Sequence, residues 1–167
     1  MWDTYMTKKI ITNFYMRRIM ESNIPYIGFL LRKKDISNVI TSFFDQVSLF
    51  RSGEQKCFSN DNIFESDLTV NNLSIAEWEW DTNEIHLDKT LIKRQYKESI
   101  LLSIDVIGKA LQERFPGNSF VVSFSIQFGK FRNINIRVCQ DLGIATLDED
   151  LDKYNQPVMQ VYFALLR

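Results

Sequence analysis

Two stretches of alternating apolar and polar residues constrain this chain more than any other feature. From Phe120 to Phe128 every second position is apolar, and the residues between are mostly serine or glutamine; the pattern returns from Ile134 to Val138. Side chains of a strand point to opposite faces in turn, so each stretch predicts a half-buried strand with a wet face. Pairing Ile126 with Ile134 keeps both apolar rows on one face, which requires a connecting loop of three or five residues. The pattern therefore predicts an antiparallel hairpin.

Residues 91–115, just before this hairpin, predict a long helix. Apolar residues recur there at helical spacing along one continuous stripe. Asp88 or Thr90 can cap its start, and Pro116-Gly117 ends it. We expect the sheet to rest on this helix.

The N-terminal part, about residues 4–50, is predicted to be helical. Its clearest stripe runs from Ile36 to Phe50 with Asp35 as N-cap, and Thr4 to Met20 predicts an earlier helix. Residues 51–72 are rich in Ser, Asn, Asp and Gly and predict a long loop.

These elements together predict an α+β fold. The chain has 167 residues, of which 45% are hydrophobic, and this fits a single domain spanning 1–167. Strands occupy 119–166. The last of them runs from Val158 to Leu165, with Met159, Val161, Phe163 and Leu165 predicted to point inward. Consecutive strands with short connections pair antiparallel, so we expect a sheet of about four to five strands with helices packed on one face.

Residues 73–88 predict a second hairpin with an acidic face. Leu73 to Trp80 and Glu84 to Asp88 both alternate, and pairing Trp80 with Ile85 gives one apolar face. The opposite face then gathers six ionisable residues: Glu77, Glu79, Asp81, Glu84, His86 and Asp88. A slip of one residue would bury these charges, so the apolar pattern itself predicts the cluster.

Acidic residues are concentrated in the middle of the chain. The net charge is only −1, from 20 basic and 21 acidic residues, but residues 45–88 hold ten acidic and two basic side chains. A concentrated negative surface steers a basic protein partner and resembles the phosphates of a nucleic acid. We expect the acidic face to bind such a partner, for example a nuclease toxin domain. A second acidic run is a secondary candidate site: Asp148, Glu149, Asp150 and Asp152. It is either a solvated loop or, if it lies near the hairpin, an extension of the same negative surface.

The sequence carries no signature of an enzyme. His86 is the single histidine, which makes two-histidine metal motifs impossible, and Cys57 and Cys139 are too few for a zinc site. Whether the two cysteines form a disulfide is open. We expect no catalytic residue, no metal and no cofactor. Three alternatives remain: an acidic face that binds nothing and only keeps the sheet solvated, a small metal-dependent enzyme using Glu79, His86 and Asp88, and an oligomeric structural subunit.

The sequence also has no feature of a membrane or secreted protein. Its first residues lack the basic start, apolar stretch and cleavage site typical of a signal peptide, so we expect none, and it contains no apolar run of the roughly 18–20 residues that cross a bilayer. We expect a cytoplasmic protein whose partners include neither a membrane nor a nucleic acid.

In size, fold class and the carboxylate face formed by Glu77, Glu79, Asp81, Glu84 and Asp88, the chain resembles bacterial immunity proteins. Proteins of this group neutralise a cognate toxin, such as a contact-dependent inhibition effector or a bacteriocin nuclease, by binding it tightly. The resemblance implies a protein without activity of its own, which occludes the active site or an essential surface of a toxin.

Overall fold

The structure is a computed structural model that describes residues 7–22, 32–52, 55–59, 72–143 and 150–164. Its seven described strands are β1 (Thr7–Thr12), β2 (Ser48–Ser52), β3 (Gln55–Ser59), β4 (Glu84–Asp88), β5 (Ser119–Gln127), β6 (Asn133–Gln140) and β7 (Val158–Ala164). The helices in the same residues are α1 (Phe14–Glu21), α2 (Lys33–Gln46), α3 (Asn72–Thr82), α4 (Lys89–Ile92), α5 (Tyr96–Arg114) and the 3₁₀ helix η1 (Leu151–Lys153).

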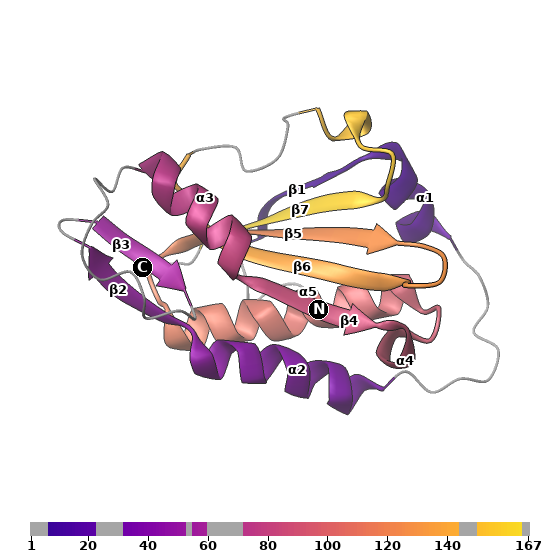
Figure 1. The fold of residues 1–167 in the computed structure, drawn as a ribbon, viewed down its shortest axis with the longest axis horizontal. Helices are drawn as coiled ribbons and strands as arrows, with labels where there is room; N and C mark the ends of the chain where they lie inside the picture. The colour runs from indigo at the N-terminus through magenta and orange to yellow at the C-terminus, as the bar shows by residue number, and fades with distance from the viewer. Residues whose placement is uncertain (1–6, 23–31, 53–54, 60–71, 144–149, 165–167) are drawn as a thin grey trace.

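Five of the strands form one antiparallel sheet in the order β1-β7-β5-β6-β4, while β2 and β3 form a separate hairpin. Helices α2 and α5 run side by side under one face of the sheet (Figure 1). We call the opposite face the open face. The predicted α+β fold and its antiparallel sheet are confirmed.

The register predicted for the central hairpin is confirmed. Ile126 lies opposite Ile134 and Phe124 opposite Ile136, and all four side chains are buried beneath the sheet. Residues 128–132 form the connection, which has the larger of the two predicted lengths. Gly129 sits there at a φ of +94°, a conformation that residues with a Cβ rarely adopt.

The core lies between the sheet and the two long helices. Ile40 and Phe44 of α2, with Ile104 and Leu111 of α5, pack against the apolar rows of the strands. On β7 the predicted inward residues Met159, Val161 and Phe163 are buried; Leu165 lies outside the described residues.

The long helix predicted over 91–115 is divided. Asp88 accepts hydrogen bonds from the backbone N–H groups of Thr90 and Leu91 and caps the short helix α4. Lys93 and Arg94 then adopt positive φ angles of 43° and 67°, which end α4 before α5 begins. The helical spacing of apolar residues continues across this break, so the sequence pattern gives no sign of it.

The helix predicted over Thr4 to Met20 is only half correct, because residues 7–12 form strand β1 at the edge of the sheet. The β-branched residues of this segment, including Ile10 and Ile11, favour a strand. Asn13 then stops the strand and caps α1, since its side chain accepts from the N–H of Met16 at 2.9 Å.

Helix α2 is shorter than predicted, and it ends at Gln46 because the chain turns into β2. Asp35 lies in its first turn and is not its N-cap, a position that Arg32 occupies. Part of the predicted loop 51–72 also folds as the β2–β3 hairpin, while residues 60–71 lie outside the described part of the chain.

The acidic hairpin predicted over 73–88 is wrong in its first half. Residues 72–82 form helix α3, and only β4 is a strand, which pairs with β6. The alternation of this segment also fits a helix, because Ile75, Glu79 and Asn83 recur at a spacing of four and are all buried. Ala76 and the glutamates further favour a helix.

Candidate functional site

Glu79 of α3 and Asn83, the residue directly after α3, both bind the backbone of strand β3. Oε1 of Glu79 accepts from the N–H of Phe58 at 2.7 Å, and Nδ2 of Asn83 donates to the carbonyl oxygen of the same residue at 2.6 Å. The other oxygen of Glu79 accepts from the N–H of Gln140 on β6 at 2.6 Å. Helix α3 is thereby fixed to both the small hairpin and the main sheet.

Burial dominates the electrostatics of Glu79. Its side chain is 0% exposed, and this desolvation raises its pKa to about 7. The hydrogen bonds from Gln140 and Phe58 lower the pKa and offset only part of that effect. Glu79 was predicted to be an exposed partner-binding residue; it is a buried structural one.

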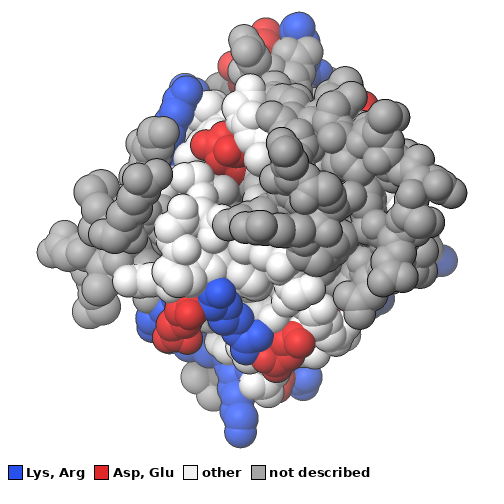
Figure 2. All heavy atoms as spheres, turned by 90° about the vertical axis from the view of Figure 1, so that its left-hand side faces the viewer, with Lys and Arg blue, Asp and Glu red and all other residues white. Residues whose placement is uncertain are grey.

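The predicted acidic face is therefore not formed. Glu77 and Asp81 are exposed on α3, whereas Glu84, His86 and Asp88 lie on β4. Figure 2 shows the end of the molecule that carries the β2–β3 hairpin; there the described Asp and Glu side chains form separate spots, and Lys and Arg lie beside some of them. The acidic face was predicted wrongly because the segment was expected to be a strand. Alternate residues of a strand share one face, whereas alternate residues of a helix point in different directions around its axis.

The three β4 residues do share one face of their strand, as predicted. His86 and Asp88 are exposed and Glu84 is partly buried. One carboxylate oxygen of Glu84 lies 3.5 Å from Nε2 of His86, and the other lies 3.3 Å from Nη2 of Arg137 on β6. Glu84 is thus partly neutralised, which reduces its value as a negative anchor for a partner.

The second acidic run has a structural role where it is described. Asp150 and Asp152 are exposed beside η1, and Asp152 accepts a hydrogen bond from the N–H of Phe14 at 2.7 Å. Asp148 and Glu149 lie outside the described residues.

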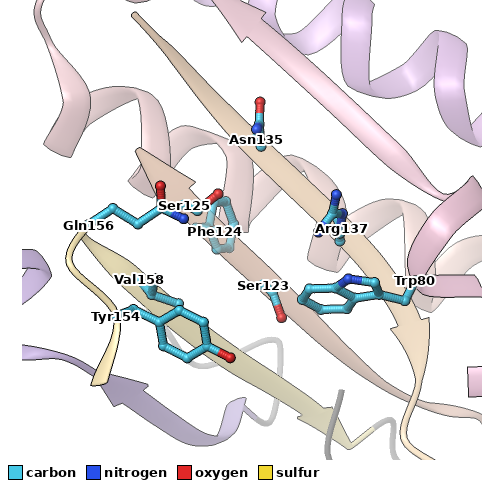
Figure 3. A pocket seen from close by; sticks show the side chains of 9 residues that line it. All are labelled: Trp80, Ser123, Phe124, Ser125, Asn135, Arg137, Tyr154, Gln156 and Val158. Carbon is cyan, nitrogen blue, oxygen red and sulfur yellow. The ribbon is translucent and has the colours of Figure 1, made fainter. Parts of the chain in front are cut away.

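A hollow of about 340 Å³ on the open face brings together a different set of residues. Trp80 from the end of α3 faces Tyr154 across the sheet, and the two rings form opposite walls (Figure 3). The complete lining is Trp80, Ser123, Phe124, Ser125, Asn135, Arg137, Tyr154, Gln156 and Val158.

Strand register determines the floor of this hollow. Ser123 lies opposite Arg137 and Ser125 opposite Asn135, so the polar residues of β5 and β6 form two adjacent rows on the open face. The wall of Tyr154 and Gln156 is held by Asn13, whose amide donates to the carbonyl oxygen of Gln156 at 2.7 Å.

Arg137 is the charged group of the hollow, and two contacts orient it. Its guanidinium carbon lies 4.7 Å from the centroid of the Trp80 ring, a distance typical of a cation–π contact. Glu84 binds one of its terminal nitrogens. Its Nε is buried and has no hydrogen-bond partner among the described residues.

The hollow has the geometry of a recognition site. Indole, phenol and guanidinium groups surround a floor of hydroxyl and amide groups, an arrangement that can hold a planar polar group by stacking and hydrogen bonds. Direct activation of Ser125 by His86 is out of reach, because β4 and β5 both pair with β6 and so lie about 10 Å apart.

The alternative metal site loses its predicted geometry, since Glu79 is buried on α3 while His86 and Asp88 are exposed on β4. Among the described residues, no group of three His, Cys, Asp or Glu side chains is placed to hold a metal ion. Cys139 is a buried free thiol, and burial and the Glu79 charge raise its pKa above the ordinary value.

Sequence reasoning missed the hollow because its walls come from segments far apart in the chain. Alternation did place Ser123 and Ser125 on a wet face, which is the one signal that pointed to the floor. Trp80 was predicted to lie on the apolar face of a hairpin, and nothing local marks Tyr154 as its counterpart.

In comparisons with known proteins, the chain matches no protein-family model, no curated protein and no solved structure. In the described part of the chain, no helix is both long and apolar enough to cross a membrane.

Proposed function

We propose that this protein is a non-enzymatic protein-binding module that uses the hollow on its open face to recognise a partner. The observation that carries the proposal is the convergence of Trp80, Arg137 and Tyr154 on one concave site. Tryptophan, tyrosine and arginine are the residue types that most often dominate the energy of protein interfaces.

The fixed position of the Arg137 side chain also supports this proposal. Arg137 is held between Trp80 and Glu84, so little side-chain freedom remains to be lost when a partner binds. A partner side chain that carries a carboxylate or amide oxygen would accept from the exposed part of the Arg137 guanidinium, and its apolar part would fit between the two aromatic walls.

The role that we propose is that of an immunity protein acting in the cytoplasm, whose partner is a toxin. The support is the small α+β fold together with a recognition hollow. The recognition surface differs from the predicted acidic face, so the partner need not be basic.

Site-specific photo-crosslinking in the cell of origin tests this proposal. A benzophenone amino acid replaces Gln156 at the rim of the hollow, and a matched control replaces Lys109, which is exposed on the outer side of α5. We expect one dominant protein adduct from position 156, its loss when Trp80→Ala is added, and no such adduct from position 109. Equal adducts at both positions would contradict the proposed site.

The captured partner then tests the immunity role. It is expressed alone, with the wild-type protein, and with the Trp80→Ala variant. We expect growth arrest in the first and third cultures and normal growth in the second. A partner that is harmless alone would overturn the immunity role but leave the binding site intact.

A further inference from the structure

The end of the molecule opposite the β2–β3 hairpin exposes several aromatic rings. Phe131 is 76% exposed and Phe128 is 60% exposed on the β5–β6 loop, while Phe14 is 52% and Tyr15 47% exposed at the start of α1. The β5–β6 loop, α1 and α4 lie at this same end of the sheet (Figure 1). Side chains of this size are normally buried, so their grouping at one end needs an explanation.

Side-chain contacts show that these segments are neighbours. The ring centroid of Tyr96, the first residue of α5, lies 5.6 Å from that of Phe128. Nζ of Lys97 donates to the carbonyl oxygen of Ser22, next to the end of α1, at 3.4 Å. Strands β1 and β5 both pair with β7, so α1 starts about two strand spacings, or about 10 Å, from the β5–β6 loop.

Helix α2 begins at the same end. Arg114 near the end of α5 forms an ion pair with Asp45 near the end of α2, so the two helices run in the same direction. Their first turns therefore lie together. We define the basic end as residues 14–22, 32–35, 88–98 and 128–132.

The basic end carries a large excess of positive charge. It contains eleven of the twenty Lys and Arg residues but only four of the twenty-one Asp and Glu residues, a net charge of +7. The remaining chain carries −8, so the total of −1 conceals a strong asymmetry. Asp150 at the start of η1, with Asp152 and Lys153 within it, lies next to this end, and these three residues reduce the local excess to +6. Segments that are far apart in sequence thus give this end of the molecule a net positive charge.

From these observations we infer that the basic end docks on the surface of an anionic lipid bilayer. Aromatic rings enter the interfacial region of a bilayer, and Lys and Arg side chains remain with the anionic headgroups. Lys130 lies 5.5 Å from the ring centroid of its neighbour Phe131, so a charged and an apolar group project together from the loop. The sequence predicted no membrane partner because it lacks a spanning segment; a peripheral surface needs none.

The geometry favours a bilayer over a single-stranded nucleic acid. Stacking of bases requires open ring faces that follow one groove. Here the rings of Phe14 and Tyr15 meet edge to face with an interplanar angle of 75°, and those of Tyr96 and Phe128 meet at 76°. Insertion into the interface of a bilayer does not require a particular ring orientation, so edge-to-face rings are compatible with bilayer binding.

Vesicle co-sedimentation with the full chain tests the inference. The probes are vesicles of phosphatidylcholine alone and vesicles with about one third phosphatidylglycerol, each at about 0.05 M and about 0.5 M salt. We expect binding to the anionic vesicles at low salt, weaker binding at high salt, and little binding to neutral vesicles. Absence of binding to anionic vesicles at low salt would overturn the proposal.

Charge-matched variants locate the surface. Arg17→Glu with Lys130→Glu should lower partitioning about tenfold or more, whereas Lys9→Glu with Lys109→Glu, away from the basic end, should change it little. Phe131→Ser should weaken the binding that survives at high salt, and Trp80→Ala should have no effect, because this inference does not depend on the hollow. Circular dichroism checks that each variant is folded. Equal losses in the two charge variants, or tight binding to a single-stranded oligonucleotide and not to vesicles, would contradict a bilayer-binding surface.

Discussion

Glu79 of α3 holds Gln140 of β6 by both its backbone and its side chain. One carboxylate oxygen accepts from the backbone N–H at 2.6 Å, and the other accepts from the side-chain amide, also at 2.6 Å. A buried carboxylate is costly unless N–H donors surround it, and here three such donors converge on Glu79. This contact places the end of α3, and with it Trp80, at the edge of the hollow.

Glu79 should make stability fall as the pH rises from about 4.5 to about 7. Its pKa is about 7 in the folded protein and 4.5 as the ordinary value, so in this window the unfolded chain loses a proton that the folded chain keeps. Stability then decreases with increasing pH, by up to about 3 kcal/mol over the whole window, and levels off above pH 7. Denaturant unfolding at several pH values measures this slope.

The matched variant for this prediction is Glu79→Gln, which cannot titrate. Contributions from all other groups cancel in the difference between the two proteins. Between pH 4.5 and 7, the free energy of unfolding of the wild type should fall steadily relative to that of the variant. A difference that is independent of pH would show that Glu79 keeps its ordinary pKa in the folded protein.

Asn13→Ala should cost about 2–3 kcal/mol, because it removes a helix cap and leaves buried groups without partners. The Asn13 side-chain oxygen accepts from the N–H of Met16 and from that of Val158 at 3.1 Å, and its amide donates to Gln156. Asn13→Asp keeps the acceptor and loses the donor, so we expect an intermediate loss. Thermal unfolding of the three proteins gives the order.

A matched control is Asn118→Ala, which removes two longer hydrogen bonds, of 3.2 and 3.3 Å, at the end of α5. Its effect should be within about 1 kcal/mol. Equal losses at the two asparagines would mean that Asn13 does not connect α1 with the hollow wall.

The parts of the fold that depended on neighbours close in sequence were predictable. Phe124 and Ile136 belong to strands joined by five residues, so burying one apolar face determined their register. The stripe of α5 was predictable for the same reason, since i and i+4 positions share a helix face.

The parts that depended on distant partners were not predictable. Glu79 is buried because backbone donors from Phe58 and Gln140 meet it, and these lie 21 and 61 positions away. From the sequence alone, a glutamate in an alternating segment is expected on the solvent-exposed face of a strand, because no local residue shows that buried N–H donors will meet it. The hollow was hidden likewise, because Trp80 and Tyr154 meet only after the sheet is assembled.

Phe58→Ala should destabilise the protein by about 3–5 kcal/mol, the usual cost of removing a large buried ring. Phe58 is fully buried, and its ring centroid lies 5.1 Å from that of Phe120 and 5.2 Å from that of Phe115. Phe131→Ala is the matched control, since it removes the same atoms from an exposed loop and should change stability by less than about 0.5 kcal/mol. Denaturant midpoints decide between a core and a surface role for the β2–β3 hairpin.

Arg137 and Trp80 should show a coupling energy of about 0.5–2 kcal/mol in a double-mutant cycle. The guanidinium lies over the indole in a partly buried site, where a cation–π contact is worth more than at an exposed one. The cycle uses Arg137→Ala, Trp80→Ala and the double variant, with unfolding free energies from denaturant titration.

Arg137→Lys separates the planar stack from the charge. Lysine keeps the positive charge but lacks the flat guanidinium, so most of the coupling with Trp80 should be lost while attraction to Glu84 persists. Trp80→Phe should retain part of the coupling, because a phenyl ring still presents a face, though a weaker one. Coupling that is unchanged by Arg137→Lys would mean that charge alone, and not stacking, orients Arg137 in the hollow.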